Sequence, residues 1–339
     1  MATTRTEREL LASLEERMAA SVDAWRPGIG VREIRPLTGG SSSLTYVVSL
    51  TDAEQLVLKV APPGLEPVRN RDVLRQARLM RALEGDQRAL LPRSLFEDAG
   101  DPPAVPPYLA MDLLPGECGE PVLQPAGERP TPTEVYERAI DAARALADLH
   151  AVDPADIGLG GEPIVTIADE IDRWTAAFRT VPADLQGEYE RCAAALHATV
   201  PPALRPVVNH GDYRLGNTLC EDGKVVAIID WEIWSIGDPR IDVTWLTFFT
   251  DEAAHPAAEP GAPAGTPTKA ELISAYEAAA SGAPLADMAW FDALTKYKEA
   301  AATALLLKRG RRGGSMPPPM QRMVAGVPRL LDEVLAGLA

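Results

Sequence analysis

Hydrophobic positions recur with two different periods along the first third of the chain. Leu10, Leu14 and Met18 fall at helical spacing among Glu and Arg, which predicts an amphipathic helix over residues 4–22. Two runs rich in β-branched and aromatic residues, at 44–50 and 55–60, predict strands, as does the shorter run at 31–37. These lengths and turns favour a meander of three antiparallel strands.

A second helix is predicted over residues 69–84, where apolar side chains again follow a helical period. Its apolar face consists of Val73, Leu74, Ala77, Met80 and Leu83. Strand signals at 94–97 and 108–113 come next. The order β-β-β-α-β-β describes an antiparallel sheet with one helix, so the predicted fold class is α+β.

The pattern becomes mostly helical after Pro115-Gly116. A long helix is predicted from Thr133 to His150, with Thr131 or Thr133 as its N-cap. The other expected elements are helices near 166–180, 185–199, 239–250, 269–281, 286–309 and 318–338, and a strand at 225–230. We therefore expect two lobes: a nucleotide-binding lobe over 1–113, and a catalytic and substrate-binding lobe over 114–339.

Composition narrows the classes of function. Hydrophobic residues make up 46% of the chain and charged residues 24%, as in ordinary globular proteins. A net charge of −16 argues against nucleic acid as a partner. The three cysteines have no metal-binding spacing, and no apolar run reaches the roughly 18 residues of a membrane span. The charged N-terminus does not resemble a signal peptide, so we expect a cytoplasmic protein that does not bind membranes. We expect it to be a monomer or a homodimer.

The strongest chemical signal is the segment HGDYRLGN at 210–217, which is followed by IDWE at 229–232. Asp212, Asn217 and Asp230 supply oxygen atoms from a loop and from the end of an apolar run. Mg²⁺ prefers such ligands, and takes one or two carboxylates together with substrate phosphates. Phosphoryl transfer needs a carboxylate that receives the hydroxyl proton and ligands for the metal. Asp212 fits the first role; Asn217 and Asp230 fit the second.

These segments resemble a known superfamily. The spacing of Asp212 and Asn217 is that of protein kinase catalytic loops, and HGDYRLGN, IDWE and GDPRIDV together resemble the aminoglycoside phosphotransferase and choline kinase-like superfamily. The likeness is greatest to a bacterial branch similar to the kinase-like domain of some acyl-CoA dehydrogenases. It covers roughly residues 30 to 310, and implies a two-lobed protein kinase-like fold with ATP and Mg²⁺ as cofactors.

The resemblance also implies where the nucleotide binds. Gly39, Gly40, Ser41, Ser42 and Ser43 lie between two predicted strands and resemble the loop that covers the phosphates. Lys59, on the third strand, is similar to the lysine that pairs with the α- and β-phosphates. The backbone of Asp112 and Leu114 resembles the hinge that holds adenine.

Two positions depart from the family pattern, and the first is Ser43, which stands in the loop resembling the phosphate cover where many relatives have Asn. Gln76 stands on the predicted second helix where relatives have a Glu that holds the lysine. Glutamine can bond Lys59 but cannot neutralise it, and Asp72, one turn earlier, is an alternative partner.

Several neighbouring residues have structural interpretations. We expect His210 to orient the loop by hydrogen bonds, Asp238 to bond that loop, and Asp242 to cap or anchor the helix that follows. Trp231, Trp234, Trp245, Phe248 and Phe249 are expected in the core.

The favoured hypothesis is an ATP-dependent O-phosphotransferase that phosphorylates a hydroxyl of a small molecule. The acceptor is open: aminoglycoside, macrolide, choline-like alcohol, sugar and hydroxyacyl thioester all fit the family. A second hypothesis is a nucleotide-binding module with little or no transferase activity. A third, a metal-dependent phosphohydrolase, is weaker because the sequence has no His/Asp cluster for two metals.

Overall fold

The protein folds as two compact units, and it is described here by a computed structural model that covers residues 5–37, 43–280, 284–313 and 318–339. The first unit comprises Met1–Pro115 together with Ala227–Ile233. The second comprises Gly116–Val226 and Trp234–Ala339. The short segment Ala227–Ile233 therefore belongs to the first unit, although in sequence it follows residues 116–226 of the second unit.

The first unit is built on one antiparallel sheet of five strands in the order β1-β2-β3-β5-β4. Its elements are α1 (Arg5–Trp25), β1 (Val31–Pro36), β2 (Leu44–Leu50), β3 (Gln55–Val60), α2 (Val73–Leu83), β4 (Ser94–Asp98) and β5 (Tyr108–Asp112). The central strands pair in register, with Lys59 opposite Thr45 on β2 and opposite Leu109 on β5. The predicted α+β order is therefore confirmed in this unit.

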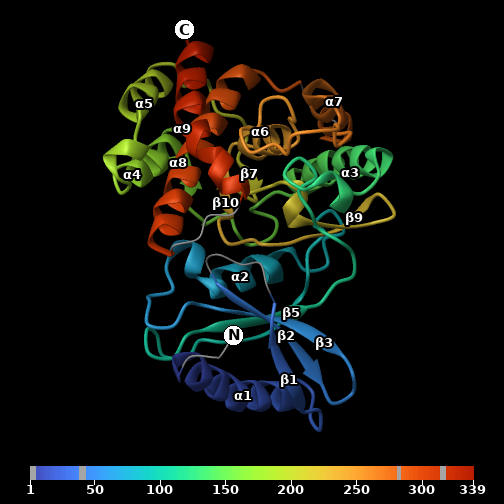
Figure 1. The fold of residues 1–339 in the computed structure, drawn as a ribbon. Helices are drawn as coiled ribbons and strands as arrows, with labels where there is room; N and C mark the ends of the chain where they lie inside the picture. The colour runs from blue at the N-terminus through green and yellow to red at the C-terminus, as the bar shows by residue number, and fades with distance from the viewer. Residues whose placement is uncertain (1–4, 38–42, 281–283, 314–317) are drawn as a thin grey trace. The chain divides into compact units, whose positions relative to one another are not determined.

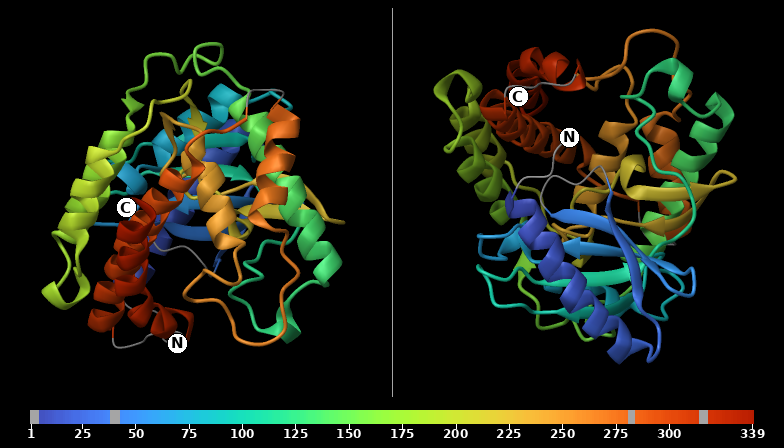
Figure 2. Two further views of the ribbon diagram at one scale, coloured as in Figure 1. Left: turned by 90° about the horizontal axis from the view of Figure 1, so that it is seen from above. Right: turned by 60° about the horizontal axis from the view of Figure 1, so that its bottom comes forward.

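Alternation along the strands assigns the two faces of the sheet to two helices, which lie on opposite sides of it (Figure 1). Leu14 and Met18 of α1 are fully buried in one cluster with Leu58 and Val60 of β3. Lys59 lies between those two strand residues and points to the other face, where α2 packs. Figure 2 shows α1 crossing the sheet from a second direction.

The start of α2 differs from the prediction. Residues 69–71 form a separate 3₁₀ turn, and the helix begins at Val73 because Asp72 caps it: the Asp72 carboxylate accepts the backbone N–H of Arg75 at 3.0 Å. A capping carboxylate satisfies one of the N–H groups that the first helical turn leaves unpaired.

The second unit is mostly helical. Its helices are α3 (Pro132–His150), α4 (Ile167–Phe178), α5 (Tyr189–Ala198), α6 (Arg240–Phe249), α7 (Lys269–Ala280), α8 (Met288–Gly313) and α9 (Pro318–Gly337). Thr131 is the N-cap of α3 and forms a capping box with Glu134, which confirms one of the two predicted caps. The helix expected over 185–199 begins only at Tyr189, after a 3₁₀ turn and Gly187 at φ +51°.

The core of this unit lies between α4, α5, α6, α8 and α9, with α8 and α9 side by side (Figures 1 and 2). Trp245 and Phe249 of α6 belong to it, and Trp231 and Trp234 are also buried, as the sequence predicted. Arg240 is fully buried at the start of α6, where Asp238 binds its guanidinium at 2.7 Å. A buried Arg needs such a partner because an unpaired charge in the interior is costly.

Short strands connect the helices. β6 (Ile164–Val165), β10 (Ser235–Gly237) and β7 (Val207–Asn209) form a three-stranded sheet, and β8 (Thr218–Glu221) pairs with β9 (Lys224–Ile228). The strand expected over 225–230 ends at Ile228, because Asp230 has φ +66° and cannot continue an extended strand.

Within residues 5–37, 43–280, 284–313 and 318–339, no helix is long and apolar enough to cross a membrane.

Candidate active site

The predicted chemical residues fall into two groups, one in each compact unit. Asp212 and Asn217 lie in the second unit, on the loop between β7 and β8. Lys59, Gln76 and Asp230 lie in the first unit.

The carboxylate of Asp212 is held by three N–H donors. Its Oδ1 accepts from the indole Nε1 of Trp245 at 2.6 Å and from Nε of Arg214 at 3.3 Å. Its Oδ2 accepts from the amide of Asn217 at 2.9 Å. The side chain remains 27% exposed, so a carboxylate of fixed orientation is accessible from solvent.

Asn217 is buried and acts on the loop through its amide nitrogen. That nitrogen donates to the backbone carbonyl of Asp212 at 2.8 Å as well as to its carboxylate. Because the nitrogen makes both bonds, the amide oxygen is the atom of Asn217 suited to a cation. The prediction that Asp212 and Asn217 act together therefore has a geometric basis.

The backbone of the loop is fixed from helix α6. Asp242, fully buried, accepts the N–H of Gly211 at 2.8 Å and the N–H of His210 at 2.5 Å. Burial raises the pKa of Asp242, but His150, His210 and Lys298 more than offset it, so the pKa is below its usual value. Asp242 is thus held as an anion where it accepts two backbone N–H groups.

This arrangement corrects two expectations and confirms a third. Asp242, and not Asp238, bonds the loop. Asp238 instead accepts the N–H of Arg240 at 3.0 Å, so it is the residue that anchors the start of α6. His210 orients the loop as predicted, because its Nδ1 accepts the N–H of Asp212 at 3.2 Å.

In the first unit, Lys59 is buried and bound from two elements. Its Nζ lies 2.5 Å from Oδ1 of Asp230 and donates to Oε1 of Gln76 at 3.2 Å. The predicted bond from Gln76 is confirmed. The alternative partner Asp72 is wrong: its carboxylate caps α2, and Asp230 supplies the charge that Gln76 lacks.

Of the residues predicted to contact the nucleotide, Ser43, Lys59, Asp112 and Leu114 lie within the described part of the chain. Gly39, Gly40, Ser41 and Ser42 lie outside the described residues, whereas Ser43 is buried immediately before β2. The carboxylate of Asp112 binds Nε of Arg93 at 2.7 Å. The backbone N–H of Asp112 donates to the backbone carbonyl of Arg93. The backbone carbonyl of Asp112 is therefore the group that would contact an adenine base. Leu114 follows in the segment after β5.

Four further residues around Asp212 were not assigned to the site from the sequence: Arg214, Glu120, Trp245 and Lys298. Arg214 stands inside HGDYRLGN, so the motif carried a signal for it. Glu120 accepts from Nη1 of Arg214 and from the N–H of Gly216, both at 3.1 Å. Burial raises the pKa of Glu120 to about 7, although Arg214 opposes the shift.

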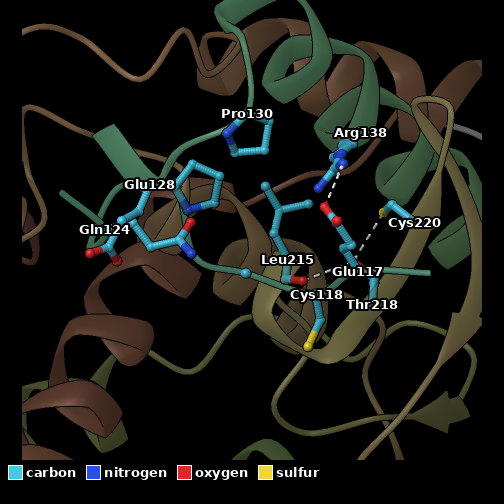
Figure 3. Close-up of a pocket in the computed structure, with 11 residues that line it drawn as sticks. Glu117, Cys118, Gln124, Glu128, Pro130, Arg138, Leu215, Thr218 and Cys220 are labelled. Carbon is cyan, nitrogen blue, oxygen red and sulfur yellow. Dashed lines mark hydrogen bonds and ion pairs between the residues drawn. The ribbon is translucent and has the colours of Figure 1, made fainter. Parts of the chain in front are cut away.

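A cavity adjoins the same loop within the second unit (Figure 3). Its volume is about 60 Å³, and Leu215 and Thr218, on either side of the segment that bears Asn217, line it. Two of the lining residues form an ion pair, in which Nη2 of Arg138 lies 3.6 Å from the Glu117 carboxylate (Figure 3). No sequence pattern indicated this space, because its walls come from two distant segments, residues 117–138 and residues 215–220.

Comparison with known proteins extends these observations. A sequence profile described as the phosphotransferase enzyme family matches residues 33–293. Acyl-CoA dehydrogenase family member 10 of Mus musculus is 28% identical over 222 residues, which are 64% of this chain and 20% of that protein. The chain therefore spans about a fifth of the length of this curated relative.

Solved structures show the fold. A putative aminoglycoside phosphotransferase from Ralstonia eutropha superposes with a TM-score of 0.74 at 20% identity, over 95% of this chain and 97% of that one. A thermostable mutant of aminoglycoside phosphotransferase APH(4)-Ia, in ternary complex with ADP and hygromycin B, superposes with a TM-score of 0.59 at 14% identity, over 96% and 98%. The predicted kinase-like α+β fold is thereby confirmed.

Proposed function

Because the chain belongs to the phosphotransferase enzyme family, whose profile matches residues 33–293, we propose that it transfers the γ-phosphoryl group of ATP to a hydroxyl of a small molecule. The family resemblance drawn from the motifs is confirmed, and the curated relative is an acyl-CoA dehydrogenase family member, as that resemblance implied. ATP, Mg²⁺ and the hydroxyl acceptor are parts of the proposal.

The observation that carries the proposal is the fixed carboxylate of Asp212. Three N–H donors orient it, and it remains partly exposed, which suits a base that must meet a hydroxyl group. Asp212 receives the proton of the attacking hydroxyl as the O–P bond forms and the bond from the γ-phosphorus to the leaving oxygen of ADP breaks.

The remaining roles follow from the chemistry of the side chains. Lys59 binds phosphate oxygens, the loop at 39–43 covers them, and the backbone of Asp112 and Leu114 holds adenine. This division places nucleotide binding in residues 1–113 and catalysis with acceptor binding in residues 114–339.

The two side chains proposed as metal ligands are of the kind that magnesium prefers. Asn217 offers an amide oxygen and Asp230 a carboxylate that is 35% exposed, and Mg²⁺ bound with substrate phosphates takes few protein ligands of this kind. When bound, Mg²⁺ would neutralise charge on the phosphate oxygens. Asp230 also neutralises Lys59, so binding of a metal and of phosphates would redistribute this ion pair.

The test is an acceptor screen with γ-labelled ATP and Mg²⁺. The panel contains aminoglycosides, macrolides, choline-like alcohols, sugars and hydroxyacyl thioesters. With the acceptor that is labelled, Asp212→Asn is expected to lower kcat by about 10²–10⁴-fold, the usual range for a lost general base. Unchanged turnover in Asp212→Asn would contradict the role of Asp212.

A second candidate is a nucleotide-binding module without transferase activity, and Gln76 is the feature that favours it. In place of a carboxylate on α2, Lys59 is bound by a neutral amide and by Asp230. Calorimetry with ATP and Mg²⁺ separates the candidates: binding without label transfer to any acceptor on the panel would favour the module.

A further inference from the structure

Lys298 is a buried lysine on α8, in the second unit, to which the sequence assigns no role. Its Nζ donates to the backbone carbonyl of Gly211 and lies 3.8 Å from the ring centroid of Trp245. The ring of Trp174 is 5.8 Å away on a third element. Among the described residues, no carboxylate lies within ion-pair distance of this ammonium group.

Such a position is unfavourable for a charge. Burial lowers the pKa of Lys298, against the attraction of Glu170, Asp212 and Asp242. The contact with the face of Trp245 and the bond to Gly211 offset part of that cost. A methionine of similar length would fill the same space without burying a charge, so stability alone does not account for a lysine here.

The contacts of Lys298 converge on the residue next to Asp212. Gly211 has φ +86°, a conformation that side chains disfavour. Its N–H is bound by Asp242 of α6, and its carbonyl by Lys298 of α8. Two buried groups of opposite charge, from two helices, thus hold the two peptide groups that flank Gly211, and the second of these leads into Asp212.

The second contact of Lys298 reaches the carboxylate itself. The ammonium group lies on the ring of Trp245, and the indole Nε1 of the same ring donates to Oδ1 of Asp212 at 2.6 Å. Movement of this ring would change the direction of the Asp212 carboxylate. Lys298 therefore contacts both the backbone before Asp212 and the side chain that orients Asp212.

We propose that Lys298 is a positioning residue of the phosphotransfer site, which fixes Asp212 through the Gly211 carbonyl and the Trp245 ring. The inference rests on the proposed function for the role of Asp212, but the geometry it describes can be tested without an acceptor. Lys298 contacts no reacting atom in this account and acts only through Gly211 and Trp245.

The first experiment reads the geometry directly. The chain has six tryptophans, so a ¹⁵N-labelled sample gives six indole N–H resonances, and Trp245→Phe identifies the one from Trp245. Lys298→Met and Asp212→Asn are both expected to shift that resonance. Lys296→Met is the matched control, because Lys296 lies on the same helix and pairs with Glu333 at 2.8 Å. A Trp245 resonance that is unmoved in Lys298→Met would overturn the proposal.

The second experiment reads catalysis, with the labelled acceptor from the screen. Lys298→Met is expected to lower kcat on the order of 10²-fold, since small misplacements of a reacting group have effects of this size. KM for ATP is expected to stay at the wild-type value, and the melting temperature at or above it. The losses in kcat of Lys298→Met and Trp245→Phe are expected to be non-additive in the double variant.

The outcomes separate the two proposals. Additive losses, a kcat within twofold of wild type, or a lower melting temperature accompanied by a higher KM would each overturn the positioning role. Absence of label transfer in the wild-type protein would contradict the proposed function, while the indole resonance would still decide whether Lys298 positions Asp212.

Discussion

At the scale of single residues, Glu299 shows how burial couples ionisation to stability. It lies on α8, one residue after Lys298, and its carboxyl group accepts the hydroxyl of Thr303 at 2.9 Å. Burial raises its pKa from 4.5 to about 7, despite the opposing hydrogen bond from Thr303. A raised pKa means that between pH 4.5 and about 7 the folded state keeps a proton that the unfolded state releases. Stability from this group is therefore present at low pH and lost as pH rises through that window.

Glu299→Gln tests this, because glutamine keeps the acceptor and cannot ionise. Relative to wild type, the variant is expected to gain stability as pH rises from 5 to 8, by on the order of 3 kcal/mol at most, at about 1.4 kcal/mol per pKa unit. Melting temperatures across that pH range measure it. Glu128→Gln, at an exposed position, is the control, and its melting temperature should change with pH as that of wild type does. If the melting temperatures of Glu299→Gln and wild type changed with pH in the same way, the carboxyl group of Glu299 would not be protonated in the folded state.

Residue-level predictions succeeded where the sequence held the partners close together. His210 and Asp212 share one loop of eight residues, and the role of His210 in orienting that loop was predicted from the motif. Lys298 lies 87 residues from its partner Gly211, and no local pattern joins the two. The exchange of roles between Asp238 and Asp242 has the same cause, since both precede or begin α6 and only the packing of the helix decides which carboxylate meets the loop.

At the scale of elements, capping decides where α2 begins, and α2 carries Gln76 to Lys59. Asp72→Ala is expected to lower the free energy of unfolding by about 1 kcal/mol, because the N–H of Arg75 loses its acceptor. Asp72→Asn keeps a capping oxygen and is expected to lose less. Denaturant or thermal unfolding measures both variants.

The same pair of variants tests the ion pair of Lys59. If Asp230 is its charged partner, Asp72→Asn should bind ATP as wild type does. Weaker ATP binding in Asp72→Asn than in wild type would indicate that Asp72 contributes charge to Lys59.

The period of the apolar positions predicted that α2 exists, but it did not predict where α2 begins. Residues 69–71 were included in the predicted helix, and only the cap at Asp72 distinguishes their 3₁₀ turn from the first turn of α2.

At the scale of the whole molecule, the period of the apolar positions and the order of the predicted elements were sufficient to predict the fold class. They were not sufficient to predict the boundary between the two compact units. The change from strands to helices near Pro115 coincides with the end of the first compact segment. No sequence pattern showed that Ala227–Ile233 belongs with that segment, because the contact between them joins residues more than a hundred positions apart: the N–H of Ile228 donates to the carbonyl of Leu90 at 2.6 Å.

The net charge of −16 is a property of the whole chain and affects its stability as such. Mutual repulsion destabilises a compact acidic protein, and salt shortens the range of that repulsion from about 30 Å at 0.01 M to about 8 Å at 0.15 M. Salt also weakens surface ion pairs, but each of these contributes only about 0–1 kcal/mol. The melting temperature is therefore expected to rise with NaCl, most steeply below about 0.15 M. Scanning calorimetry over a NaCl series, with sucrose of matched osmolality as the uncharged control, measures the effect. A melting temperature that falls with salt would mean that local ion pairs, and not the excess of acidic residues, dominate the electrostatic part of the stability.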